Sequence, residues 1–143
     1  MAQTTVLIID DNVNLARGFA VGLANAGYVV EVAHSAHDGL ALAASLQPEV
    51  IILDFQMPFV NGVGFLYRLR EMPTLHDTAV MVVTGVCVTD EVLEEFRELH
   101  AELRFKPIGL AALISEVDQL VNARAPSAGP AFNQFARLQR PGY

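Results

Sequence analysis

The stretch Val6–Asn12 reads VLIIDDN, four aliphatic residues followed by two adjacent carboxylates and an amide. Four consecutive apolar residues are typical of a strand buried on both faces, as in a parallel sheet covered by helices. Asp10 and Asp11 would then stand together at the end of a buried strand, where like charges repel and resist desolvation. This placement predicts that the two acids have a function.

Similar apolar runs recur along the chain and alternate with segments of helical periodicity. Gly27, Ser35 and Thr89 stand where caps of the predicted helices belong. Five βα repeats of this kind predict an α/β fold, a doubly wound five-stranded parallel sheet with helices on both faces. The predicted strands are Val6–Asp10, Val29–Ala33, Glu49–Asp54, Ala79–Thr84 and Glu102–Phe105, and the predicted helices lie near residues 13–26, 36–46, 63–71, 90–100 and 109–122.

Length and composition bound the kind of protein. The 143 residues, 52% of them hydrophobic, suffice for one domain with its own core. No apolar run approaches the roughly 18 residues that a membrane span needs. A single cysteine, Cys87, fits a reducing compartment, and we expect a cytoplasmic protein. The net charge of −7 argues against nucleic-acid binding, which requires a basic surface.

The charge is unevenly distributed between a body and a tail. Residues 1–122 hold all 16 acidic residues and six of the nine lysines and arginines, whereas residues 123–143 hold three arginines and no acid. We therefore expect one domain over residues 1–122 and a short basic tail over residues 123–143. We expect this tail to be a flexible terminus. The alternative is that Phe132, Phe135 and the arginines of the tail dock on an acidic surface.

The ends of the predicted strands carry the candidate site. In doubly wound sheets, ligands bind beyond the carboxyl ends of the strands. Asp10, Asp11, Asp54, Thr84 and Lys106 stand at these ends. Clustered carboxylates without His or Cys favour a hard divalent ion, Mg²⁺ or Mn²⁺. One acid of such a cluster can also attack phosphorus to form an aspartyl phosphate, while a lysine and a hydroxyl stabilise the phosphoryl oxygens.

At these residues the chain resembles the receiver domain of two-component response regulators. Four pieces match in order and spacing: IIDDN at 8–12, ILDFQMPFVNG at 52–62, VVTG at 82–85 and RFKP at 104–107. The resemblance covers about residues 4–122 and implies the flavodoxin-like strand order 2-1-3-4-5. With only about 20 residues after the last predicted helix, the chain resembles stand-alone, single-domain response regulators, although it could be a fragment of a longer protein.

The resemblance also implies roles for individual residues. Asp54 resembles the phosphoacceptor, Thr84 the switch hydroxyl and Lys106 the salt-bridge partner, and the Lys106–Pro107 peptide bond is expected to be cis. For the metal, the resemblance implies that Asp11 binds directly and Asp10 through water, with Asp54 and the backbone carbonyl of Gln56 as further ligands.

Some positions depart from the family pattern. Leu103 stands where many relatives have a Tyr or Phe, and Gly85 stands where Ala is common. Gln56 and Val86 occupy positions that tune spontaneous dephosphorylation in the family.

The predicted function is that of a signalling receiver rather than a conventional enzyme. The expected donor is a sensor histidine kinase or a histidine phosphotransfer protein, and the output is a changed affinity for a protein target. Receivers commonly signal through the face of the fourth helix, fifth strand and fifth helix, which also suits a homodimer. Acidic residues follow each other at helical spacing down one side of the predicted fourth helix, and they form either a solvated face or a recognition surface: Glu91, Glu94, Glu95, Glu98 and Glu102.

Two other functions remain open at this stage. A metal-dependent phosphatase of the haloacid dehalogenase type would need an acid two residues after its nucleophile, but Asn12 follows Asp10 and Gln56 follows Asp54 at that spacing. An interaction module that is not phosphorylated would keep the fold without the switch. Leu103 favours this alternative, whereas Asp54, Thr84 and Lys106 oppose it.

Overall fold

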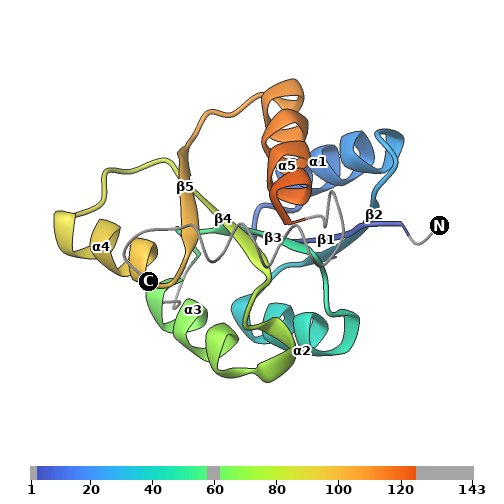
Figure 1. The fold of residues 1–143 in the computed structure, drawn as a ribbon. Coiled ribbons are helices and arrows are strands. Elements are labelled where there is room, and N and C mark those ends of the chain that lie inside the picture. The colour runs from blue at the N-terminus through green and yellow to red at the C-terminus, as the bar shows by residue number, and fades with distance from the viewer. Residues whose placement is uncertain (1–2, 58–61, 125–143) are drawn as a thin grey trace.

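The computed structural model describes residues 3–57 and 62–124 of the chain, and within them the strands form one parallel sheet. The strand order is β2-β1-β3-β4-β5, which confirms the flavodoxin-like order (Figure 1). The strands are β1 (Thr5–Ile9), β2 (Val29–Ala33), β3 (Val50–Asp54), β4 (Ala79–Thr84) and β5 (Ala101–Phe105). The helices are α1 (Val13–Asn25), α2 (Ala36–Leu46), α3 (Gly62–Glu71), α4 (Asp90–Glu98) and α5 (Leu110–Arg124), with a short 3₁₀ helix, η1 (Pro73–Leu75).

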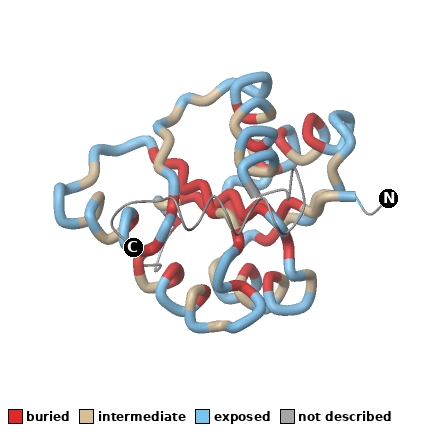
Figure 2. The backbone as a smooth tube through the Cα atoms, viewed as in Figure 1, coloured by how far each residue is buried: buried red, intermediate tan, exposed pale blue. Residues whose placement is uncertain are grey.

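Helices cover both faces of the sheet, as the apolar runs predict. Helices α1 and α5 lie on one side and α2 and α3 on the other (Figure 1). The buried parts of the chain run through the central strands (Figure 2). Because side chains alternate along a strand, Leu7 and Ile9 of β1 join the core under α2 and α3, whereas Val6 and Ile8 join the core under α1 and α5.

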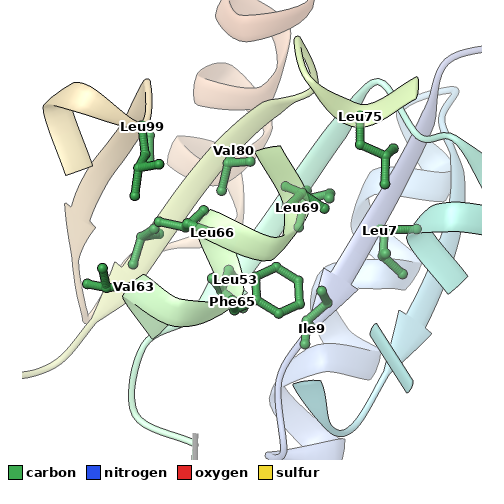
Figure 3. Close-up of a cluster of buried hydrophobic side chains, with 14 of the residues drawn as sticks. Leu7, Ile9, Leu53, Val63, Phe65, Leu66, Leu69, Leu75, Val80 and Leu99 are labelled. Carbon is green, nitrogen blue, oxygen red and sulfur yellow. The ribbon is translucent and has the colours of Figure 1, made fainter. Parts of the chain in front are cut away.

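The core under α3 is the larger of the two clusters. Leu66 and Leu69 of α3 are completely buried and pack with Leu53 and Val80 of the strands (Figure 3). Full burial of one such side chain stabilises the fold by about 1.5–3 kcal/mol. The two core clusters, one on each face of the sheet, hold the carboxyl ends of β1, β3 and β4 in fixed positions relative to one another.

The helix ends follow from local hydrogen bonds. The side chains of Ser35 and Thr89 accept the N–H groups of Asp38 and Val92, which confirms both as N-caps. Asn12 is a third N-cap, which the sequence pattern did not reveal, and its side chain accepts the N–H of Leu15.

The end of α1 depends on Gly27. This residue has φ +107°, a conformation that suits glycine, and it ends α1 as predicted.

Several predicted boundaries differ from the structure by one or two residues, and two of these differences involve charged residues. Helix α4 ends at Glu98, and His100 has φ +57°, so the chain turns into β5. Glu102 therefore lies on β5 and not on the fourth helix with the other four glutamates, which corrects that assignment. Helix α5 continues to Arg124, two residues past its predicted end at residue 122. Residues 125–143 lie outside the described residues, so the predictions made for this part of the tail stay predictions.

Arg70, near the end of α3, hydrogen-bonds to the backbone of two turns of the chain. The guanidinium of Arg70 donates to carbonyl oxygens at distances of 2.6–3.2 Å, from segments on either side of β4. These hydrogen bonds tie α3 to the turn before β4 and to the turn before β5. The acceptors are Leu75, His76, Thr78, Leu99 and His100.

Among residues 3–57 and 62–124, no helix combines the length and the apolar character needed to cross a membrane.

Candidate functional site

The carboxyl ends of β1, β3, β4 and β5 bring the predicted site residues to one edge of the sheet. In the parallel register Asp54 lies opposite Val83, and Thr84 lies opposite Phe105, the residue before Lys106. The backbone N–H of Lys106 donates to the carbonyl of Thr84 at 2.7 Å and continues this pairing one residue further. The strand pairing, rather than any local motif, therefore places these side chains together.

Three carboxylates form the centre of the site. One oxygen each from Asp10, Asp11 and Asp54 lies within 4.8 Å of the others. Asp10 and Asp54 are each only 5% exposed, whereas Asp11 is exposed. None of the four histidines, all of which lie in the described ranges, joins this group.

Burial and charge disturb the titration of Asp10. Burial raises the pKa of Asp10 above its usual value, and the negative charge of Asp54 raises it further. The backbone N–H of Asn12, which donates to Oδ1 of Asp10 at 2.8 Å, and the charge of Lys106 both lower this pKa. The net direction is upward, chiefly because burial disfavours the charged form of the carboxylate.

Lys106 supplies the cation that the structure places nearest this cluster. Its Nζ lies 3.2 Å from Oδ1 of Asp54 and 4.0 Å from Oδ2 of Asp10. The peptide bond between Lys106 and Pro107 is cis, as the family resemblance implies. One ammonium cannot neutralise three carboxylates, and an all-oxygen donor set suits a hard divalent cation such as Mg²⁺. The chemistry of the donors therefore fits the metal that the sequence predicts.

The hydroxyl of Thr84 faces its own loop rather than a carboxylate. Thr84 is fully buried, and its Oγ1 accepts the N–H of Val86 at 3.2 Å and lies 3.4 Å from the carbonyl oxygen of Val86, to which it donates. The structure thus places Thr84 beside the site, with its hydroxyl engaged in the loop that leads to α4.

The side chain of Gln56 has a contact that the sequence did not indicate. The side-chain Oε1 of Gln56 accepts the N–H of Gly85 at 2.7 Å, and the backbone N–H of Gln56 donates to Oδ1 of Asp54 at 3.1 Å. The sequence assigned Gln56 only a backbone ligand and a position that tunes dephosphorylation. The unusual glycine at position 85 was the one available signal, because it leaves room above the site.

A groove lies away from the acidic pocket, between α4, β5 and α5. Its volume is about 760 Å³, and its lining includes Leu93 and Phe96 of α4, Leu103 of β5 and Leu120 of α5. Glu91, Glu94, Glu95 and Glu98 lie on α4 with exposed or half-exposed side chains.

Comparison with known proteins identifies a family. A family model described as the response regulator receiver domain matches residues 6–118. The curated relatives include the "DNA-binding dual master transcriptional regulator RpaA" of Synechocystis, which is 30% identical over 125 residues, covering 86% of this chain and 52% of that protein. The "transcriptional regulatory protein PcoR" of Escherichia coli is 29% identical over 127 residues, covering 86% of this chain and 54% of that protein. This chain therefore spans about half the length of such relatives.

Solved structures agree with the family match. The chemotaxis protein CheY4 of Vibrio cholerae superposes with a TM-score of 0.76 at 27% identity, covering 83% of this chain and 99% of that one. A CheY-like receiver domain protein from Methanospirillum hungatei, at 21% identity, shares the fold with a TM-score of 0.78, covering 85% of this chain and 96% of that one. Receiver domains generally bind Mg²⁺ at an acidic pocket of the kind that Asp10, Asp11 and Asp54 form here. The chain belongs to the response regulator receiver domains, the signalling modules of two-component systems.

Proposed function

We propose that Asp54 accepts a phosphoryl group from a phosphohistidine, carried by a sensor histidine kinase or a histidine phosphotransfer protein. The observation that carries the proposal is the 3.2 Å contact between Lys106 Nζ and Asp54 Oδ1, in a cluster where Asp54 is one of three carboxylates. Asp54 alone among these acids combines near-complete burial with both a backbone N–H and a lysine ammonium on one oxygen. Those two donors hold the carboxylate in one orientation within the pocket.

The proposed step is a simple displacement at phosphorus. A carboxylate oxygen of Asp54 forms the new P–O bond while the P–N bond of the donor breaks. The electron pair of the broken bond stays on the imidazole nitrogen. Lys106 faces the negative charge that develops on the phosphoryl oxygens, and the reaction needs no oxidant or reductant.

The carboxylates also offer ligands for the metal ion of this step. The side chains of Asp10, Asp11 and Asp54 and the backbone carbonyl of Gln56 would hold Mg²⁺, or Mn²⁺ in its place. When bound, the ion supplies positive charge that stabilises phosphoryl oxygens. Asp11 is the exposed member of the set, which favours it as a direct ligand, whereas Asp10 is already engaged with the N–H of Asn12.

Phosphorylation would act on the rest of the molecule through Thr84. Its hydroxyl now bonds to the backbone of Val86, so turning towards a phosphoryl group on Asp54 would release the loop before α4. Helix α4 borders the groove with β5 and α5, and this groove is the surface we assign to a protein target or a second copy. We infer no nucleic-acid partner, because the chain carries a net charge of −7.

Acetyl phosphate tests the proposal directly. The protein is incubated with Mg²⁺ and acetyl phosphate, and its intact mass is measured over time. We expect one added phosphoryl group in wild type and in Asp38→Asn, a matched change at an exposed acid of α2, but none in Asp54→Asn. Labelling of Asp54→Asn at the wild-type rate would refute the assignment of the phosphoacceptor.

The same experiment separates the two alternatives. An interaction module that is not phosphorylated would gain no mass in any variant. A phosphatase would show steady turnover of acetyl phosphate instead of a stable or decaying phosphoryl adduct. The geometry disfavours the phosphatase, because the residues two positions after Asp10 and Asp54 are amides with other partners. The side chain of Asn12 caps α1, and that of Gln56 bonds to Gly85.

A further inference from the structure

The side chain of Gln56 joins the two loops that border the acidic pocket. Its Oε1 accepts the N–H of Gly85 at 2.7 Å, across 29 residues of sequence. The backbone N–H of the same residue donates to Oδ1 of Asp54 at 3.1 Å. Gln56 therefore contacts both the proposed phosphoacceptor and the residue that follows Thr84.

A glycine at position 85 makes this contact feasible. A Cβ atom added there would lie 2.9 Å from Oε1 of Gln56, closer than real Cβ atoms approach a neighbour. The backbone does not demand glycine, because Gly85 is not among the described residues with a positive φ. The close approach of Gln56 is thus the feature of position 85 that an alanine would remove.

The loop after β4 has its donors engaged at three consecutive residues. The hydroxyl of Thr84 bonds to the backbone of Val86, the N–H of Gly85 bonds to Gln56, and the N–H of Val86 bonds back to Thr84. A phosphoryl group brings strong acceptor oxygens and additional negative charge. Any of these donors that turns to such a group must first leave its present partner.

We propose that Gln56 is a latch, in which its side-chain oxygen holds the Gly85 N–H in the unphosphorylated chain and must release it before the loop after β4 closes on Asp54. The inference rests on the proposed phosphorylation of Asp54. Gln56 acts here as a positioning residue, since its side chain sets the place of another loop. The latch opposes closure, because the bond exists only in the open arrangement.

Exposure to water limits how much the hydrogen bond between Gln56 and Gly85 stabilises the open arrangement. Gln56 and Gly85 are both exposed, so their bond competes with water. A neutral hydrogen bond of this kind shifts an equilibrium by roughly 2- to 10-fold. The latch therefore tunes the response of the loop rather than blocking it.

Binding of beryllofluoride, a phosphoryl mimic, tests the latch. Gln56→Met keeps the length of the side chain but removes the acceptor, and Gly85→Ala displaces Gln56 without changing it. We expect each variant to bind beryllofluoride with Mg²⁺ about 2- to 10-fold more tightly than wild type. Since both changes remove the same bond, the double variant should gain no more than either single one. Gly18→Ala, at an exposed position of α1 with open space around it, is the control and should bind like wild type.

Amide hydrogen exchange separates failure of the latch from failure of the function. Without any ligand, the N–H of Gly85 should exchange more slowly in wild type than in Gln56→Met. A wild-type protein that binds no beryllofluoride and gains no phosphoryl group would overturn the proposed function. Normal binding with equal affinities in wild type and both variants, or an additive double variant, would overturn the latch alone.

Discussion

The ammonium nitrogen of Lys106 lies 3.2 Å from Oδ1 of Asp54, although 52 residues separate the two in sequence. The two residues do not share a helix, a strand or a turn, so local structure cannot bring their side chains together. The pairing of β3 with β4 and of β4 with β5 sets their positions, and the Lys106 N–H bonded to Thr84 fixes the end of β5. The contact thus links the sheet topology to the chemistry of the pocket.

Loss of this ammonium should slow phosphorylation of Asp54. Lys106→Met removes the positive charge that faces the developing charge on the phosphoryl oxygens, so the rate of adduct formation should fall on the order of 100-fold. The rate is measured by intact mass with acetyl phosphate and Mg²⁺. Arg68→Met, which removes an exposed cation of α3, should react like wild type. An unchanged rate in Lys106→Met would show that the lysine has no part in phosphoryl transfer.

Metal affinity should distinguish the two adjacent acids. Asp11→Asn should weaken Mg²⁺ binding more than Asp10→Asn, because Asp11 is exposed at the pocket and Asp10 is held by the Asn12 N–H. Each substitution removes one negative charge, so a difference between them reports position rather than charge. Calorimetric titration of each variant with Mg²⁺ gives the two dissociation constants. Weaker binding by Asp10→Asn than by Asp11→Asn would reverse the assignment of the direct ligand.

Replacement of Arg70 should destabilise the fold without touching the acidic pocket. Arg70→Lys keeps the charge, but an ammonium cannot reproduce the planar guanidinium that donates to five carbonyl groups. The free energy of unfolding in urea should fall by about 2 kcal/mol, the value of a hydrogen bond from a charged donor. Arg68→Lys on the same helix is exposed and should change it by less than about 0.5 kcal/mol. Equal effects of the two substitutions would contradict this view of Arg70.

The phenol of Tyr28 should lose its proton at an unusually high pH. Burial, then the hydrogen bond to Asp118 and the negative charge of that residue, raise the pKa of Tyr28 from 10.0 to about 12. Because the folded pKa is raised, the stability that Tyr28 contributes is fully present below pH 10 and is lost as the pH rises through about 12. The ultraviolet absorbance of tyrosinate should show a step near pH 12 in wild type and in Tyr67→Phe, but not in Tyr28→Phe. A step that survives in Tyr28→Phe would assign it to another residue.

Leu103 should limit how strongly phosphorylation changes the groove. It lies opposite Val82 of β4 and lines the groove between α4, β5 and α5, half-buried and without a polar group. A switch shifts populations only by the difference in interaction between its two states. Leu103→Tyr should therefore enlarge the change in target affinity or self-association caused by beryllofluoride. A large wild-type change that Leu103→Tyr leaves unaltered would show that position 103 is not where the response is set.

The sequence by itself determined the fold class and the members of the acidic pocket. Runs such as VLII and VIIL are apolar on both faces, and this requirement of a covered parallel strand is visible residue by residue. Parallel strands present their carboxyl ends at one edge, so Asp10, Asp54, Thr84 and Lys106 could be assigned to one site before any coordinates. The strand order itself came from family resemblance, because periodicity does not state which strands are neighbours.

Only the tertiary structure decided which partners the polar groups of that edge take. The amide of Gln56 bonds to a glycine 29 residues away, and Arg70 bonds to carbonyls in two turns that follow different elements. A flexible polar side chain has many acceptors and donors within reach, and its choice depends on where loops from other strands come to lie. The position of Glu102 also depended on the folded chain. Helix α4 ends at Glu98 and the chain turns at His100, with φ +57°, so Glu102 lies on β5 although its spacing from the other glutamates is helical. Apolar periodicity can be read from residues that are close in sequence. Hydrogen-bond partners at this edge depend on where loops that are far apart in sequence lie after folding.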